Sequence, residues 1–383
     1  MDYYDSSIKE EMSAVSSKFD QSYWRQVCEE KLFPDEYWNA LSKSGLFGIM
    51  IEKKFGGMER GLVDLSIAVE ETAENFAGIA SYLYLSGSLV STIFSANASE
   101  VQKKEFLPKL ARGETKVSIA LGEEVSGFDA ASIETRAVKS EGGFRISGEK
   151  AFVNNVDQAD YLILFARTTP LEKSEKKSLG VSMFIVDAKD PKIKSTKLEK
   201  LGWDFLNNFR IKFEDLKVES SKVLGELDRA WYNAVASFNL DRVATSASLV
   251  GTGKLALALA SSWAKQRVIF GREIGSNQGI QFPLAEAFAY LEASWMMTLK
   301  AAMLRDRGKS YVNEANYSLL SSSNAAMNST DRALQTFGGH GYYKDYDVER
   351  HWRDVRVHRI HPISEELLLG AIAERALGLP KSY

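Results

Sequence analysis

Hydrophobic positions change their spacing twice along the chain. Through residues 1–116, apolar side chains recur every three or four positions, the spacing of helices with one buried face. From Val117 they alternate with polar side chains in short runs that Gly, Asn, Asp and Pro separate, which is typical of strands. After Gly225 the helical spacing returns in long segments. This order predicts two helical domains on either side of a β domain.

The changes of spacing set the expected domain boundaries. We predict an N-terminal helical domain at 1–116, a middle antiparallel β-barrel at 117–226 and a C-terminal four-helix bundle at 227–383. Ser99 precedes EVQKKEFLPKL and is the expected N-cap of the last helix of the first domain. The predicted helices of the bundle span residues 230–267, 283–309, 312–337 and 364–379.

Composition and charge place the chain among soluble multidomain proteins. Its 383 residues exceed what one hydrophobic core usually organises, and its hydrophobic content of 45% is ordinary. A formal net charge of −3 argues against a nucleic acid or an anionic membrane as partner, because both require a concentrated positive field. Cys28 is the only cysteine, which excludes an internal disulfide. The acidic start, MDYYDSSIKEEM, lacks the features of a secretory signal or transit peptide, so we expect a cytoplasmic protein.

The most specific stretch of the sequence spans residues 335–367. Gly338, Gly339 and Gly341 form a tight turn at which the backbone can approach a ligand that a side chain would exclude. Charged residues follow at the spacing of helical ion pairs. Taken alone, this stretch is better interpreted as a turn between two helices with a solvated face.

An ordered set of motifs surrounds the glycine turn. It reads Gln335-x-x-Gly-Gly-x-Gly, then Tyr346-x-Val-Glu-Arg, then Arg353-Asp354. This set resembles the C-terminal signature of the acyl-CoA dehydrogenases, flavoenzymes that desaturate acyl-CoA thioesters, and the resemblance extends over nearly the whole chain. It implies the same three-domain order, an FAD cofactor and an acyl-CoA substrate. It also implies an electron-transfer flavoprotein as electron acceptor and a homotetramer or homodimer.

A loop rich in small residues, LGEEVSGFD at 121–129, follows the first predicted strand. It falls where the family has a Thr-Glu-Pro-x-Ala-Gly-Ser-Asp loop around the flavin and the thioester end of CoA. Glu123, Gly127 and Asp129 match that motif, whereas the positions of its threonine, proline and serine differ. The resemblance implies cofactor contacts from Leu121, Glu123, Gly127 and Phe128.

The segment Gly148–Asn155, GEKAFVNN, resembles the family's Gly-x-Lys-x-Trp-Ile-Thr-Asn. In the family, the aromatic residue of this motif covers one face of the flavin and the threonine hydroxyl approaches flavin N5. Phe152 can still stack on a ring and Asn154 can still donate a hydrogen bond. The resemblance therefore implies FAD contacts from Phe152, Val153 and Asn154. From the residues alone, a strand with one core phenylalanine is equally plausible.

A third segment carries groups suited to a dinucleotide. The fork of Arg267 suits a pyrophosphate, and the amide of Gln278 can bond to adenosine. Alone, Arg267 is also credible as a partner in a surface ion pair. In the family, this segment and the glycine turn hold the ADP half of an FAD whose flavin belongs partly to the neighbouring subunit. The resemblance thus assigns FAD contacts to Arg267, Phe270, Gln278, Gln335, Gly338 and Gly339, and adds Ser364 and Glu366 by position.

The usual catalytic acid of the family is missing from this chain. Desaturation needs a base for the α-proton and hydrogen bonds to the thioester oxygen as charge develops there. Most members supply both from a glutamate two residues after an isoleucine, in Ile-Tyr-Glu-Gly-Thr. This chain has Ile360-His361-Pro362, and proline has neither a carboxylate nor an N–H.

One branch, resembling isovaleryl-CoA dehydrogenase, places its glutamate on an earlier helix, immediately before an arginine. This chain has Asp241-Arg242 there. We predict Asp241 as the catalytic base, provided that a poorly solvated site raises its pKa from the reference value of ~3.9. The competing interpretation is that Asp241 pairs with Arg242 or caps a turn. The predicted substrate contacts are Phe238, Arg242 and His361.

The missing glutamate leaves other functions open. A flavin-dependent monooxygenase or reductase acting on a non-standard substrate would keep the cofactor, and a non-catalytic relative would bind flavin or CoA for assembly. A metal site is not expected, although the C-terminal region holds four histidines. His340 belongs to the glycine turn, and Asp354, which lies between His351 and His358, belongs to the matched Arg-Asp pair.

Overall fold

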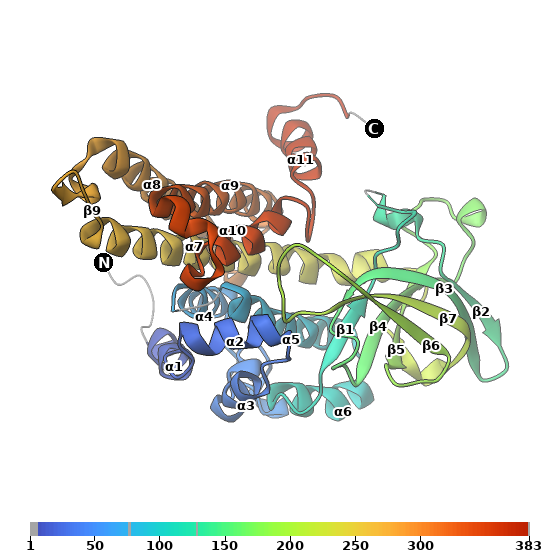
Figure 1. Cartoon of the computed structure of the whole chain (residues 1–383). Coiled ribbons are helices and arrows are strands. Elements are labelled where there is room, and N and C mark those ends of the chain that lie inside the picture. Colours follow the sequence, from blue (N-terminus) through green and yellow to red (C-terminus); the bar gives the residue numbers. More distant parts are fainter. Residues whose placement is uncertain (1–6, 76–77, 128, 382–383) are drawn as a thin grey trace.

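The computed structural model describes residues 7–75, 78–127 and 129–381, and its helices and strands fall into three blocks (Figure 1). The first block is helical, as predicted. Ser99 caps its last helix in a capping box: the Ser99 hydroxyl accepts from the Gln102 N–H at 3.3 Å, and the Gln102 side chain accepts from the Ser99 N–H at 2.9 Å. The helices are α1 (Ser7–Ser16), α2 (Gln21–Glu30), α3 (Asp35–Ser44), α4 (Leu62–Glu74), α5 (Gly78–Asn97) and α6 (Glu100–Ala111).

The middle block is a single curved sheet. Its strands are β1 (Val117–Ala120), β2 (Arg136–Ser140), β3 (Gly143–Asn154), β4 (Tyr161–Arg167), β5 (Val181–Asp187), β6 (Ile193–Leu198), β7 (Asn208–Glu219) and β8 (Val223–Leu224). They are hydrogen-bonded in the order β6-β7-β3-β2-β4-β5-β8, with β1 beside β4. Buried and exposed positions alternate along β7, so one face of the sheet forms the core.

The sheet is mixed rather than purely antiparallel, which corrects the predicted strand arrangement. β1 runs parallel to β4 over its whole length, and β2 meets β4 in parallel at one residue pair. Alternation of apolar residues identifies a strand but carries no information about the direction of its neighbour. The remaining pairs, including the long β3–β7 ladder, are antiparallel.

Long helices make up the third block. They are α7 (Ala230–Gln266), α8 (Gln278–Asp306), α9 (Val312–Phe337), α10 (Val348–Arg356) and α11 (Glu365–Leu377), with a small hairpin of β9 (Val268–Ile269) and β10 (Arg272–Glu273) after α7. α8 begins at Gln278 rather than at Pro283, which lies inside the helix. α7, α8 and α9 pack along one another together with α4, and α11 packs on α9.

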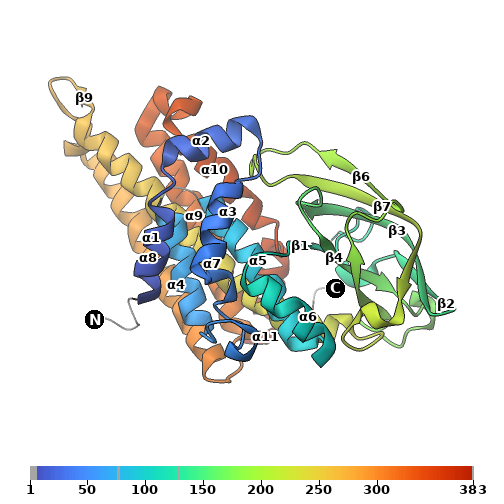
Figure 2. The same ribbon diagram turned by 90° about the horizontal axis from the view of Figure 1, so that it is seen from below.

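α7 links the ends of the molecule. It has 37 residues, which at 1.5 Å per residue is roughly 55 Å. The helix starts beside the curved sheet and ends at the β9 hairpin on the opposite side (Figures 1 and 2). One 18-residue window of α7 is apolar enough to cross a membrane, but 83% of that window is buried inside the protein, as in a core helix. Residues at its two ends therefore belong to different parts of the surface.

Candidate active site

Two motifs that the sequence assigns to one site lie side by side at the edge of the sheet. The Ala151 N–H at the end of β3 donates to the Gly122 carbonyl at 2.9 Å, and Lys150 Nζ donates to the Leu121 carbonyl at 3.0 Å. The 121–127 loop is therefore fixed against the strand that carries Phe152. Phe128, a predicted cofactor contact, lies outside the described residues.

Glu123 holds this loop from inside. Its buried carboxylate lies 2.6 Å from Lys150 Nζ and accepts from the Thr135 hydroxyl at 2.6 Å and the Glu134 N–H at 2.6 Å. Burial would raise the pKa of Glu123, but the charge of Lys150 and these hydrogen bonds outweigh it and lower the pKa. The Glu123 side chain is fully engaged within the protein, so a ligand contact from Glu123 would come from its backbone. Gly127, at φ +38, turns the chain at the end of the loop.

The end of β3 carries two strained residues and an open ring. Phe152 has φ +59, a conformation costly for a bulky side chain, and its side chain is 65% exposed. Val153 is buried in the core of the sheet, so only its backbone can reach a ligand. The Asn154 side-chain oxygen accepts from Asn208 Nδ2 across the β3–β7 ladder. Asn155 also has positive φ, and its buried side-chain oxygen lacks a hydrogen-bond partner among the described residues.

The C-terminal segment reaches the sheet through residues 199–207. The Trp203 N–H donates to Asp354 Oδ1 at 2.6 Å, and Arg353 Nη1 donates to the Leu201 carbonyl at 2.8 Å. Burial raises the pKa of Asp354 to about 6. The exposed ring of His361 meets Trp203 edge-on at 6.1 Å. This contact connects His361 to the segment that continues into β7.

The positions next to His361 have structural roles at the start of α11. Pro362 offers no N–H, and Ile363 packs against the cluster of Leu249 and Leu368. Ser364 is the N-cap of α11 and accepts from the Leu367 N–H at 3.4 Å. Glu366 is exposed in the first turn of the helix.

Asp241 lies in the buried part of α7, with only 8% of its surface exposed. Among the described residues, its one hydrogen bond comes from the Thr245 hydroxyl at 3.4 Å and no ion pair joins it to Arg242. Burial raises the pKa of Asp241 to about 7, against the opposing effects of the Arg242 charge and the Thr245 hydrogen bond. The poorly solvated environment that a catalytic aspartate requires is therefore present. The ion pair with Arg242 that the competing interpretation requires is not found among the described residues.

Arg242 is held by two carboxamides. Its Nη1 donates to Asn239 Oδ1 at 2.8 Å and to Asn316 Oδ1 at 3.0 Å, from α7 and α9 respectively. Burial lowers the pKa of Arg242, although the nearby Asp241 acts in the opposite sense. Phe238, one turn earlier, stacks at 6.2 Å on Phe165 of β4. A fixed cation, a buried acid and an aromatic ring thus follow one another on α7.

The remaining predicted cofactor residues gather at the far end of the bundle. Arg267 and the fully exposed Phe270 lie in the β9 hairpin, and Gln278 is exposed at the start of α8. The ring of Trp263 lies 4.9 Å from both Phe337 and His340 of the glycine turn. Because the Arg267 N–H donates to the Trp263 carbonyl at 2.9 Å, the hairpin and the turn form one surface.

The glycine turn itself is open. Gly338 has φ +60 and ψ −136, a conformation that favours glycine, and no described atom lies within 4 Å of the position of a Cβ at Gly338 or Gly339. Gln335 is exposed one turn before it. This surface is separated from Asp241 by 26 residues of α7, roughly 39 Å, and the β9 hairpin lies at the end of α7 opposite the sheet that includes β3 (Figure 1). One chain therefore does not bring all the predicted FAD residues to one place.

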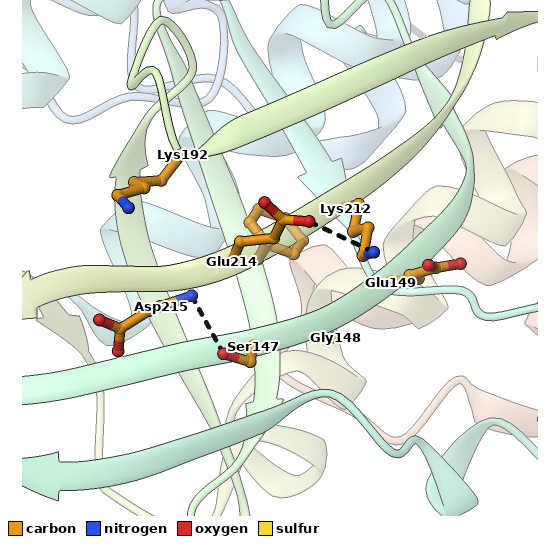
Figure 3. Close-up of a pocket in the computed structure, with 8 residues that line it drawn as sticks. Ser147, Gly148, Glu149, Lys192, Lys212, Glu214 and Asp215 are labelled. Atoms are coloured by element: carbon orange, nitrogen blue, oxygen red, sulfur yellow. Dashed lines mark hydrogen bonds and ion pairs between the residues drawn. The ribbon is translucent and has the colours of Figure 1, made fainter.

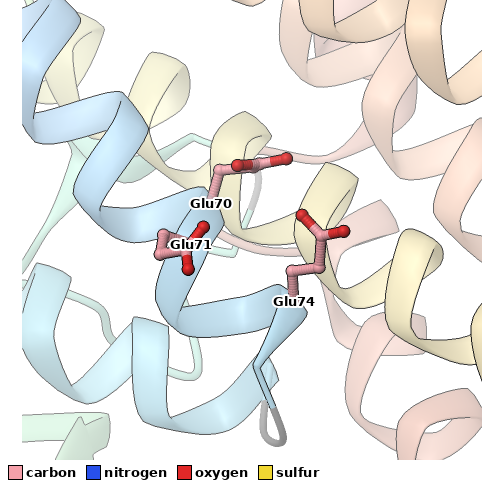
Figure 4. Close-up of side chains that lie close together, drawn as sticks. All are labelled: Glu70, Glu71 and Glu74. Carbon is pink, nitrogen blue, oxygen red and sulfur yellow. The ribbon is translucent and has the colours of Figure 1, made fainter. Parts of the chain in front are cut away.

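Glu70, Glu71 and Glu74 lie together on α4 (Figure 4). Lys254 Nζ is 2.9 Å from Glu70 and Lys9 Nζ is 3.1 Å from Glu71, so two of these three carboxylates pair with lysines.

A shallow hollow of about 520 Å³ lies on the sheet (Figure 3) and contains none of the predicted residues. Its Lys212 and Glu214 pair with each other at 3.3 Å, and its Ser147 hydroxyl accepts from the Asp215 N–H at 3.1 Å. Four of the polar residues that line it thus have partners within the protein.

The chain matches the sequence profiles of three acyl-CoA dehydrogenase domains in order. The N-terminal domain matches residues 5–114, the middle domain 118–216 and the C-terminal domain 228–377. The chain belongs to the acyl-CoA dehydrogenase family. An acyl-CoA dehydrogenase of Bacillus subtilis is 34% identical over 347 residues, covering 90% of each chain. A 3-(aryl)acrylate reductase of Clostridium sporogenes is 33% identical over 349 residues, covering 90% of this chain and 91% of that protein.

A solved structure agrees with this assignment. Butyryl-CoA dehydrogenase from Megasphaera elsdenii is 28% identical, and its structure superposes with a TM-score of 0.90 over 96% of this chain and 98% of the other. The three-domain fold expected for an acyl-CoA dehydrogenase is confirmed. The members of this family are FAD-dependent oxidoreductases, and the present chain is therefore an FAD-dependent oxidoreductase.

The residues of this family member fit FAD. Phe152 exposes its ring from a backbone conformation that costs free energy, and strain of this kind persists where function requires it. The buried side-chain oxygen of Asn155 is unsatisfied among the described residues, which is unusual unless a ligand or water completes it. The exposed guanidinium of Arg267 and the open glycine turn suit a pyrophosphate.

Sequence reasoning missed four residues that organise the site. Lys150 forms an ion pair with Glu123, and Asn208 donates a hydrogen bond to Asn154. The ring of Trp203 contacts His361, and the ring of Trp263 contacts His340 of the glycine turn. Lys150 was visible in its motif but was not assigned a role. The partners of the other three lie far away in the sequence, so spacing along the chain gave no signal for them.

Proposed function

We propose that this protein desaturates, or in reverse saturates, the α,β bond of an acyl-CoA thioester, with Asp241 as the base that takes the α-proton. When bound, FAD would supply the acceptor for the β-hydride at flavin N5. The proposal is supported chiefly by Asp241, a buried carboxylate without an ion pair whose pKa is raised to about 7. A base with this pKa exists in both protonation states near neutral pH, as general base catalysis requires.

The groups around Asp241 take the other roles. Arg242, fixed by Asn239 and Asn316, would stabilise the charge of the deprotonated Asp241 and contact the substrate. Phe238 and His361 would line the substrate path. Because Pro362 supplies no N–H, the thioester oxygen loses one familiar donor, and such a loss typically costs ~2.7–4 kcal/mol of transition-state stabilisation. The Ile363 N–H, next along the chain, is the proposed replacement.

The FAD would lie against the edge of the sheet. Phe152 and Asn154 would contact its flavin, with the backbones of Leu121, Glu123, Gly127 and Val153 around it. The residues proposed for the ADP half are Arg267, Phe270, Gln278, Gln335, Gly338, Gly339, Ser364 and Glu366.

A second copy of the chain is part of the proposal. The roughly 39 Å of helix between Asp241 and Arg267 supports an arrangement in which the hairpin and glycine turn of one subunit serve the flavin of another. A homodimer or a homotetramer satisfies this equally. An electron-transfer flavoprotein is the proposed acceptor, by analogy with the family.

Anaerobic bleaching tests the reaction. We expect the yellow protein to lose its flavin absorbance near 450 nm on the order of seconds or faster with an acyl-CoA of suitable length. The Asp241→Asn variant should bind FAD but bleach at least about 100-fold more slowly, whereas Asp241→Glu should retain part of the rate. Bleaching of Asp241→Asn at the rate of the parent would remove Asp241 as the base.

Reduction of an unsaturated acyl group is the second candidate. The relative from Clostridium sporogenes, a 3-(aryl)acrylate reductase, is 33% identical, and the usual glutamate is absent from this chain. Protein reduced with dithionite and then mixed anaerobically with an enoyl-CoA or a 3-aryl acrylate would regain its yellow colour. Rapid reoxidation without bleaching by any acyl-CoA would favour this direction, and consumption of oxygen with substrate would favour a monooxygenase.

A further inference from the structure

Asn154 and Asn208 form a side-chain pair at the edge of the sheet. Asn154 is the last residue of β3 and Asn208 is the first of β7, and the two are direct partners in the antiparallel register. Asn208 Nδ2 donates to Asn154 Oδ1. Their neighbours Val153 and Phe209, also register partners, are buried in the core. The two amides therefore lie on the outer face, as expected from alternation along a strand.

Asn208 is held firmly enough to orient its partner. Its backbone pairs with β3 on one side and, through Leu198, with β6 on the other. The preceding residue is fixed as well, because Asn207 Nδ2 donates to Asp157 Oδ2 at 2.7 Å and the Asn207 carbonyl accepts from the Asn155 N–H at 2.7 Å. A partner with a fixed backbone limits the rotation of the Asn154 carboxamide.

The pair leaves Asn154 with one kind of polar group to offer. Its side-chain oxygen is occupied by Asn208, and among the described residues none accepts a hydrogen bond from its Nδ2. A carboxamide offers an acceptor oxygen and a donor NH₂ group, and a clamp on the oxygen leaves the donor. A hydroxyl at the same position would donate or accept as required, because its hydrogen rotates.

We propose that Asn208 is a positioning residue that fixes Asn154 as a hydrogen-bond donor to the flavin and thereby lowers the reduction potential of the bound FAD. The inference depends on the proposed function, which puts Asn154 beside flavin N5. Oxidised N5 carries a lone pair and accepts a hydrogen bond. Two-electron reduction by hydride transfer puts a hydrogen on N5, which then must donate. A group that can only donate stabilises the oxidised form and opposes the reduced one.

The consequence concerns the direction of the reaction. Once an electron donor such as an electron-transfer flavoprotein had reduced it, a flavin with a lowered potential would give up its electrons more readily and would favour hydride delivery to the β-carbon of an unsaturated acyl group. The α-carbon then takes its proton from the acid form of Asp241. Clamping of Asn154 thus favours the reductive direction of the proposed chemistry.

The test is the midpoint potential of the bound FAD, measured by anaerobic titration against reference dyes. We expect Asn208→Ala to shift the potential to a more positive value, because the released amide can turn its oxygen toward N5–H. Asn208→Val, which suits a strand better, should do the same. Asn154→Thr should also shift it positively. The matched control, Asn207→Ala, removes the neighbouring amide and should leave the potential unchanged.

The double variant decides whether Asn208 acts through Asn154. If it does, Asn208→Ala adds no further shift in the Asn154→Thr background. An equal shift in both backgrounds, or parental potentials for both Asn208 variants, would overturn the inference. If neither Asn208 variant folds, an unchanged potential in Asn154→Thr overturns it alone. If the parent bleaches with acyl-CoA but the variants show no shift, only this inference is wrong. If the parent takes up no FAD, the proposed function is wrong as well.

Discussion

Lys150 Nζ lies 2.6 Å from Glu123 Oε1, and both side chains are buried beneath the 121–127 loop. Replacement of Lys150 by Met leaves a buried carboxylate without its counter-ion. We expect a loss of roughly 3–5 kcal/mol in the free energy of unfolding, the typical cost of breaking a buried pair from one side. FAD affinity should fall as well, because Lys150 also holds the Leu121 carbonyl. Urea unfolding and FAD titration measure the two effects.

An exposed pair supplies the control for Lys150. Lys194 and Glu214 pair at 2.9 Å on the surface of the same sheet, and Lys194→Met should cost no more than about 1 kcal/mol. Adding Glu123→Gln to Lys150→Met should recover part of the stability, since the buried charge is then gone. Equal losses for Lys150→Met and Lys194→Met would contradict the structural role given to Lys150.

Removal of the Asp241 charge should stabilise the protein while it inactivates the enzyme. The folded-state pKa of about 7 lies above the ordinary value of 3.8, so folding favours the protonated form. The stability that protonated Asp241 contributes is present below pH 3.8 and is lost as the pH rises through 7. At pH 8, Asp241→Asn should therefore gain up to roughly 4 kcal/mol relative to the parent, and little at pH 4.

Paired denaturation curves at pH 4 and pH 8 check this expectation for Asp241. The rate of flavin bleaching by the parent should rise with pH through about 7, because the base must lose its proton. Thr245→Val removes the hydrogen bond that the Thr245 hydroxyl donates to the carboxylate and should move that rise to higher pH. A difference in stability that is the same at both pH values would show that the carboxylate is solvated.

The backbone conformation of Phe152 costs folding free energy and leaves its ring exposed. Its φ of +59 costs about 1–2 kcal/mol for a residue with a side chain, a cost that glycine does not carry. Phe152→Gly should leave the apoprotein as stable as the parent or slightly more so. FAD affinity should fall by roughly 2- to 12-fold, the equivalent of a stacking contact of ~0.5–1.5 kcal/mol.

Phe152→Trp is the matched variant, because it keeps an aromatic face at the same backbone position. It should retain the FAD affinity of the parent. Calorimetry of the apoprotein and fluorescence titration of FAD give the two quantities. Undiminished FAD affinity in Phe152→Gly would remove the ring from the proposed flavin site.

Separation of Asp241 and Arg267 along α7 predicts complementation between subunits. If the hairpin of one copy serves the flavin of another, Asp241→Asn and Arg267→Ala inactivate different parts of a shared site. Random mixing of the two variants by unfolding and refolding, or by coexpression, would then restore about a quarter of the parental activity in a dimer. Each variant refolded alone is the control, and no recovery in the mixture would place both residues in sites within one chain.

Much of the architecture was predictable from local patterns. Helical spacing and the N-cap at Ser99 depend on neighbours within a few residues, and the structure reproduces them. The parallel pairing of β1 with β4 was not predictable in this way, because it joins residues more than 40 positions apart. Apolar alternation is the same for parallel and antiparallel neighbours, so the direction of a strand depends on the path of the whole chain.

In the candidate site, too, local motifs were predictable and contacts between distant residues were not. Motif resemblance pointed to Asp241. The structure shows that Asp241 is buried and, among the described residues, has no ion pair, as the prediction required. Motif resemblance could not reveal that Glu123 pairs with Lys150 or that Asn154 accepts a hydrogen bond from Asn208. Those partners lie 27 and 54 residues away, and only the folded sheet brings them into contact.

The unbroken helix α7 restricts how this chain can change length. Insertion or deletion of a single residue between Asp241 and Arg267 would rotate everything beyond it by about 100° and move it by roughly 1.5 Å along the axis. The β9 hairpin would then face another direction while Asp241 stayed in place. Homologues that share this geometry should therefore vary in length at the surface loops and keep the number of residues in this interval constant.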